Sequence, residues 1–275
     1  MTRRHLAFAC EAETLVGTLD EGASGVGLLI VSGGSEVRAG PFGSQSRIAA
    51  QIAAHGHAVF RYDRRGIGDS TGEDPRFSGS GADIAAALAA FREAAPQVRR
   101  VVAFGNCDAG SALMLTAGAG CDALVLTNPW TFEGEAAEDS AAMPAEAIRA
   151  RYAARLKDPR EWLRLLRGGV DLRKLARGLV RALSKPAPPS SLAEDMRAGL
   201  ARFAGDTRIL LAGSDRTAQA FAAVWPRDDP RLVHRNRADH AFSAPPDRDW
   251  LVAQILAALG EQALFDKQAG QLDVN

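Results

Sequence analysis

Short apolar runs alternate with amphipathic stretches along most of this 275-residue chain. An uninterrupted apolar run of five or six residues is typical of a strand that is buried on both faces of a sheet. After two short strands around Glu11–Glu13, the pattern predicts strands at residues 26–31, 58–62, 101–104, 123–127, 208–213 and 231–236. Helical spacing predicts helices at about residues 45–54, 81–94, 217–224 and 247–259. This alternation predicts an α/β fold, with a mostly parallel sheet covered by helices on both faces.

The alternation stops between residues 131 and 205, where proline repeatedly breaks a helical pattern and no strand is predicted. An interval of this length is too long for a simple connection inside a compact domain. We therefore expect a helical cap, inserted at 131–205 into a core formed by residues 1–130 and 206–262. The last residues, 263–275, are expected to form a frayed tail.

The overall charge and the cysteine content exclude several classes of protein. The formal net charge is zero, which gives no indication of nucleic-acid binding or of attraction to a membrane surface. No apolar run approaches the roughly 18 residues of a membrane-spanning helix. Cys10, Cys107 and Cys121 have neither metal-ligand spacing nor the even number of a disulfide framework. We expect a cytoplasmic protein with no metal, no cofactor, no nucleic-acid partner and no stable membrane insertion.

A candidate nucleophile follows the strand predicted at residues 101–104. That strand runs into Gly105-Asn106-Cys107-Asp108-Ala109, and a helical pattern begins at Ser111. A strand, one sharp turn and a helix are the layout of a nucleophile elbow, in which serine is the usual nucleophile. Small residues two before and two after Cys107 let the strand and the helix approach, and the helix N-terminus favours a thiolate and an oxyanion. Taken alone, the segment is equally compatible with a buried cysteine in a packing role.

A thiol nucleophile needs a base, and the base needs a partner that orients it. His240 lies between the last predicted strand and the last predicted helix, at the sheet edge where ligand chemistry collects. Asp215 follows the strand at 208–213 and is expected at the same edge, although it could instead cap the helix that begins near Thr217. Asp239 is a rival acid, but the immediate neighbour of a histidine reaches its ring poorly.

Two backbone N–H groups are needed to hold the oxyanion of an acyl-transfer reaction. We expect one to be that of Asp108, the residue after the nucleophile. The other is expected from Gly34 or Ser35, in the loop after residues 26–31, although an ordinary turn would also explain Gly33-Gly34. A second glycine-containing loop, residues 63–70, lacks the third glycine of a dinucleotide fingerprint. It is interpreted as a structural turn near the site, with Asp63 and Arg64 in buried polar contacts.

Residues 62–72, Tyr-Asp-Arg-Arg-Gly-Ile-Gly-Asp-Ser-Thr-Gly, resemble the Asp-x-Arg-Gly-x-Gly-x-Ser signature of α/β-hydrolases. The order of Cys107, Asp215 and His240 along the chain also agrees with that family. More narrowly, residues 105–109, 126–130 and 211–218 resemble the bacterial exosortase A system-associated hydrolase type 1. The resemblance spans about residues 1–260 and implies an α/β-hydrolase fold, with a cysteine nucleophile and a link to exopolysaccharide genes. Dienelactone hydrolases also use cysteine at the elbow, in Gly-x-Cys-x-Gly, but this chain has Ala109 at the last position.

Two functions of different classes are predicted. The first is a hydrolase, or acyl transferase, in which Cys107, His240 and Asp215 act on an ester or thioester of a small-molecule or glycan-linked acyl substrate through a thioacyl-enzyme. The second is a non-catalytic α/β-hydrolase relic that binds a small molecule or a partner in polysaccharide assembly. Thiol reactivity separates the two, because a catalytic cysteine alkylates rapidly below pH 7 and a buried structural thiol does not.

Overall fold

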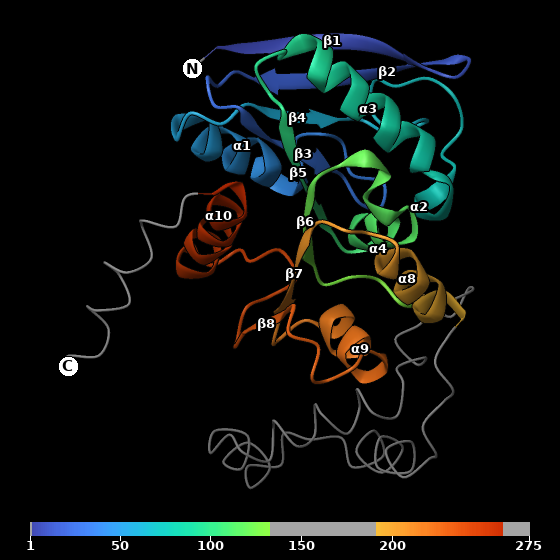
Figure 1. The fold of residues 1–275 in the computed structure, drawn as a ribbon, viewed down its shortest axis with the longest axis vertical. Coiled ribbons are helices and arrows are strands. Elements are labelled where there is room, and N and C mark those ends of the chain that lie inside the picture. The colour runs from blue at the N-terminus through green and yellow to red at the C-terminus, as the bar shows by residue number, and fades with distance from the viewer. Residues whose placement is uncertain (1, 133–190, 261–275) are drawn as a thin grey trace, which may run out of the picture.

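A computed structural model describes residues 2–132 and 191–260. In this part of the chain eight strands form one sheet in the order β1-β2-β4-β3-β5-β6-β7-β8, which runs from top to bottom of Figure 1. The strands are β1 (Arg3–Cys10), β2 (Glu13–Asp20), β3 (Val26–Val31), β4 (Val59–Tyr62), β5 (Arg100–Asn106), β6 (Ala123–Thr127), β7 (Asp206–Ala212) and β8 (Leu232–Arg235).

The sheet is antiparallel at one end and parallel everywhere else. β1 and β2 form a hairpin in which Arg3 pairs with Asp20 and Cys10 with Glu13, and β2 also runs antiparallel to β4. From β4 to β8 every neighbouring pair is parallel. The parallel strands therefore end at one common edge, where the loops that follow β3, β5, β6, β7 and β8 meet.

Helices cover both faces of the sheet. Figure 1 shows α1 (Ser44–Ala54) and α10 (Pro245–Leu259) on one side, and α3 (Gly81–Ala94), α8 (Ser191–Ala201) and α9 (Arg216–Val224) on the other. The helix α4 (Asp108–Leu115) packs on β5 and β6 and against α8. The remaining elements are short: α2 (Arg76–Gly79) and the 3-10 turns η1 (Pro41–Gly43) and η2 (Ala117–Gly120).

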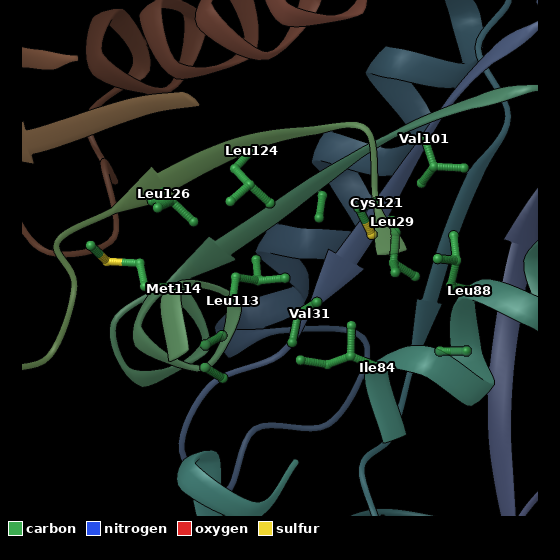
Figure 2. Close-up of a cluster of buried hydrophobic side chains, with 14 of the residues drawn as sticks. Leu29, Val31, Ile84, Leu88, Val101, Leu113, Met114, Cys121, Leu124 and Leu126 are labelled. Atoms are coloured by element: carbon green, nitrogen blue, oxygen red, sulfur yellow. The ribbon is translucent and has the colours of Figure 1, made fainter. Parts of the chain in front are cut away.

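The apolar runs of the strands supply two cores, one on each face. Leu29 and Val31 of β3 lie in the core under α3 and α4, whereas Leu28 and Ile30 lie in the core under α1 and α10. Figure 2 shows the first of these cores, in which strand residues such as Leu29, Leu124 and Leu126 face Ile84 and Leu88 of α3 and Leu113 of α4. Because side chains alternate between faces, a strand covered on both sides must be apolar at nearly every position.

This architecture confirms the α/β fold with a mostly parallel sheet that the sequence predicts. Residues 26–31, 81–94 and 123–127 form their predicted elements with the predicted bounds, and other ends shift by a few residues. The four-residue helix α2 was not predicted, since it is too short to show periodicity.

Most of the expected cap, residues 133–190, lies outside the described residues, as does the expected tail. The end of the expected insertion is described, and it forms α8, whose Met196 and Leu200 are buried in the core beside α4. Within the described ranges no helix is both long and apolar enough to cross a bilayer.

Candidate active site

Cys107 lies on the turn between β5 and α4. Its backbone has a conformation that residues other than glycine seldom adopt. Its φ is 60° and its ψ is −127°, and a non-glycine residue in such a region costs about 1–3 kcal/mol. Hydrogen bonds hold the turn: the Cys107 N–H donates to the Thr127 carbonyl at 2.9 Å, and the Ser111 and Trp130 N–H groups donate to the Cys107 carbonyl at 3.3 Å. The thiol is therefore presented at the carboxyl edge of the sheet by a rigid turn.

The two small residues of the elbow let the strand and the helix approach closely. A Cβ added to Gly105 would lie 2.8 Å from the backbone carbon of Ala109, a distance that real side chains do not tolerate. Ala109 itself is buried at this contact. The pattern Gly-x-Cys-x-Ala thus meets a steric requirement of the crossing between β5 and α4.

Three side chains from three separate loops meet at this edge. Nδ1 of His240 lies 3.0 Å from Oδ2 of Asp215, and His240 is also hydrogen-bonded to the thiol of Cys107. Asp215 is 8 % exposed, whereas the side chain of His240 is 41 % exposed. The candidate acid is therefore buried beneath a base that remains open to solvent, and the base joins the acid to the thiol.

Asp215 makes both of the contacts that its position suggested, one to the helix and one to His240. It is the N-cap of α9, where Oδ2 accepts a hydrogen bond from the Ala218 N–H at 2.9 Å. The same oxygen faces His240, so the helix cap fixes the carboxylate that orients the imidazole. The rival acid, Asp239, instead accepts hydrogen bonds from Ser243 and Ala241 within its own loop.

These contacts change the protonation of His240. Its pKa is raised to about 10, first by the hydrogen bond to Asp215 and then by the hydrogen bond to Cys107, while burial opposes the shift. Both contacts therefore favour the protonated form of the ring.

The candidate oxyanion groups lie beside the elbow. Asp108 is the first residue of α4, and Gly34 and Ser35 follow β3 at the same edge of the sheet. In this structure the Gly34 N–H donates to Oδ1 of Asp108 at 2.7 Å, so a side chain already occupies one of the two candidate loop amides. The Arg64 guanidinium donates to the Gly34 carbonyl, which holds the same peptide from its other side.

The loop at residues 63–70 packs against the loop after β3. Asp63 is fully buried and accepts hydrogen bonds from the Arg38 N–H at 2.6 Å and the Asp69 N–H at 3.1 Å. Arg64 is 2 % exposed and reaches Asp74 at 3.8 Å in addition to Gly34. The expected buried polar contacts of Asp63 and Arg64 are thus present, and they connect this loop to the one after β3.

Sequence reasoning missed Asn128 as a residue that positions the site. Its amide oxygen accepts a hydrogen bond from the Ala212 N–H at 2.9 Å, and its amide nitrogen donates to the His240 carbonyl at 3.1 Å. Asn128 is fully buried with a φ of 46°. The only signal in the sequence was an asparagine directly after the strand at 123–127. Asn128 connects the ends of β6 and β7 to the loop that carries His240.

Comparisons with known proteins show the family to which this fold belongs. A model of the alpha/beta hydrolase family matches residues 28–254, which is most of the chain. The chain belongs to the alpha/beta hydrolase family. Among proteins with curated functions, none matches the sequence significantly. Within the described residues, no group of three or more histidine, cysteine or acidic side chains is arranged to hold a metal ion.

Solved structures of other proteins share the fold at low sequence identity. GrgF from Penicillium sp. sh18 is 16% identical with a TM-score of 0.60, over 94% of this chain and 98% of that one. The esterase Pf2001 from Pyrococcus furiosus is 13% identical with a TM-score of 0.59, over 94% and 90%. Est1E from Butyrivibrio proteoclasticus, solved with ferulic acid bound, is 15% identical with a TM-score of 0.55, over 92% and 99%.

Proposed function

We propose that this alpha/beta hydrolase cleaves a carboxylic ester or a thioester through a thioacyl-enzyme on Cys107. One observation carries the proposal: His240 contacts the Cys107 thiol on one side and the buried Asp215 carboxylate on the other. A nucleophile, a base and a group that orients the base are the three parts of a catalytic triad. The esterase Pf2001 among the structural neighbours supports an ester as the substrate.

Acylation begins from the thiolate of Cys107 and the imidazolium of His240. The sulfur forms a bond to the carbonyl carbon, and the carbonyl oxygen takes up the negative charge next to the Asp108 N–H and the loop after β3. When this tetrahedral intermediate collapses, the bond from the carbonyl carbon to the leaving group breaks. The leaving group takes the proton of the imidazolium, and Asp215 keeps the neutral ring in place.

Deacylation requires His240 to act as a base, and acylation itself prepares it for this role. The hydrogen bond to Cys107 and the charge on its sulfur are two of the causes that raise the pKa of His240. Both disappear when the sulfur carries an acyl group, so the pKa of the ring falls. The neutral ring then accepts a proton from water, or from another hydroxyl or amine acceptor, as that oxygen or nitrogen attacks the thioacyl carbon. The thiolate is released and the ion pair with His240 is restored.

The acyl substrate of this proposal is a small molecule or a glycan-linked ester, used in exopolysaccharide biosynthesis. This part rests on the resemblance of residues 105–109, 126–130 and 211–218 to the exosortase A system-associated hydrolases.

A second candidate is a non-catalytic relic that binds a small molecule or a partner. One observation favours it: the Asp108 carboxylate occupies the Gly34 amide, which would otherwise be free to hold an oxyanion. The contact between His240 and Asp215 favours the enzyme, because a relic has no use for an oriented base. Reaction of Cys107 with an acyl donor decides between the two.

The experiment mixes the purified protein with p-nitrophenyl acetate and records its intact mass within seconds, with Cys107→Ala in parallel. We expect one acetyl group on the parent protein, absent from the variant, that decays as p-nitrophenolate continues to be released. Equal activity of Cys107→Ala would refute the cysteine mechanism. If the parent protein shows neither adduct nor turnover and its Cys107 alkylates slowly below pH 7, the binding function is favoured over the hydrolase.

A further inference from the structure

The side chain of Asp108 lies where the oxyanion of a substrate is expected. Its Oδ1 accepts the Gly34 N–H at 2.7 Å, and the carboxylate also accepts the N–H of Ala109. A Cβ added to Gly33 would lie 2.4 Å from the same Oδ1, so the carboxylate packs directly on the loop backbone. A carboxylate oxygen on a backbone amide imitates, in charge and in geometry, the oxyanion that such an amide stabilises.

The peptide of Gly34 is held from both sides. Its N–H faces Asp108, and its carbonyl accepts from the buried Arg64 guanidinium, which also reaches Asp74. Gly34 has a φ of +53° with open space where a Cβ would be, so the contact is not enforced by crowding. Arg64 thus orients the Gly34 amide toward the elbow, and Asp108 is the group that this amide meets.

We propose that Asp108 is a positioning residue that governs acylation: its carboxylate occupies the Gly34 amide at rest and must give way to the carbonyl oxygen of the substrate. The inference rests on the proposed function. Once Oδ1 of Asp108 has moved away from the Gly34 N–H, the N–H groups of Gly34 and Asp108 together form the oxyanion hole. The energy needed to break a charge-assisted hydrogen bond is then part of the barrier to acylation.

The protonation of Asp108 controls how strongly it holds the amide. Burial raises the pKa of this carboxyl, and Asp74 acts in the same direction, whereas the hydrogen bond from Gly34 and the charge of Arg64 oppose the shift. Glu36, on the loop after β3, also interacts with Asp108 and with His240. An ionised carboxylate accepts the amide strongly and a neutral one weakly. Lowering the pH through the pKa of Asp108 therefore releases Gly34.

The first test observes the contact itself, independently of any substrate. The backbone amide resonance of Gly34 is followed by NMR in the wild-type protein and in Asp108→Asn as the pH is lowered. We expect this resonance to titrate with Asp108 in the wild type and to remain constant in Asp108→Asn, which keeps an acceptor but cannot ionise. A resonance that does not change with pH in the wild type would overturn the inference.

The second test measures the rate of acylation with p-nitrophenyl acetate in Asp108→Ala, Asp108→Asn and Glu36→Gln. Dividing each rate by that of the wild type at the same pH cancels effects of pH on the Cys107–His240 pair. We expect Asp108→Ala to acylate about tenfold faster than the wild type at neutral pH, with the ratio falling toward one in acid. Asp108→Asn should show a smaller ratio that does not depend on pH.

Glu36→Gln is the matched control. It removes a neighbouring negative charge but leaves the hydrogen bond between Gly34 and Asp108 intact, so its ratio measures the effect of charge alone. A ratio of one or less for a folded Asp108→Ala, or an equal rise in Glu36→Gln, would overturn the inference while the proposed function stands. If no variant forms an acyl-enzyme, the proposed function fails and the inference fails with it.

Discussion

Cys107 differs from the other two cysteines of the chain in its exposure to solvent and in the groups that surround its thiol. Cys10 and Cys121 are 3% and 6% exposed and lie in the core beneath α3 and α4. Burial raises the pKa of Cys10 to about 11, with a further contribution from Asp83, and it raises that of Cys121 to about 12. Cys107 is partly exposed, and its thiol is hydrogen-bonded to His240.

The comparison shows that a thiol acquires its chemistry from its surroundings. In the core, apolar neighbours disfavour the thiolate, and the S–H of Cys10 donates to the Asp83 carboxylate at 3.5 Å. At the sheet edge, the turn that carries Cys107 and the loop after β8 bring the sulfur of Cys107 and the ring of His240 together. The predictions below test how far this difference extends and which contacts maintain it.

Alkylation should separate the cysteines by the largest factor. We expect iodoacetamide to modify Cys107 at least about a thousand times faster than Cys10 or Cys121 at pH 7, since a thiol with a pKa of 11 is only about 1 part in 10⁴ thiolate there. Mass spectrometry of peptides measures each rate. The contrast should shrink as the pH rises toward 11 and should vanish in denaturant. Rapid labelling of Cys10 in the folded protein would contradict it.

Asp215→Asn should lower the rate of acylation by about 10²–10⁴-fold, because His240 loses the charge that orients it and keeps it protonated. Asparagine can still accept the hydrogen bond from Ala218, so the melting temperature should change little. Asp239→Asn is the matched control, since it removes the other carboxylate beside His240. Equal losses in the two variants would mean that charge, rather than the contact between Asp215 and His240, matters.

Gly105→Ala should destabilise the protein by about 1–3 kcal/mol, because its Cβ would press on the backbone of Ala109. Urea unfolding measures the free energy, and alkylation of Cys107 reports whether the elbow survives. Gly25→Ala is the control, since a Cβ there meets only the Gln97 carbonyl at 3.7 Å. If both variants have the same free energy of unfolding, the close approach of β5 and α4 does not contribute to the stability of the protein.

Asn128→Ala should have the smallest of these effects, about 1–2 kcal/mol of stability, because the Ala212 N–H and the His240 carbonyl lose a buried partner. Acylation should slow as well, since the loop that carries His240 loses a tether. Asn128→Gly removes the same hydrogen bonds but accepts the φ of 46° without strain. The difference between the two variants in urea unfolding gives the cost of that strain.

Much of the fold could be predicted because its physical causes are local. A strand buried on both faces must be apolar at nearly every position, as residues 26–31 and 123–127 are, and the order of residues in α3 shows its buried stripe. The hairpin of β1 and β2 and the direction of the other strands follow from the lengths of their connections. The helix α2 could not be foreseen, because four residues are too few to show a period.

The chain by itself determined the candidate nucleophile, its small neighbours and the residues suited to act as base and acid, since each follows a strand and the strands must end at one edge. Only the tertiary structure decided which of them touch. Oδ2 of Asp215 faces His240 while it caps α9, Asn128 connects the ends of β6 and β7 to the loop of His240, and Asp108 occupies the Gly34 amide. These contacts join residues up to 112 positions apart, and no local pattern encodes a distance between loops that meet only when the sheet has formed.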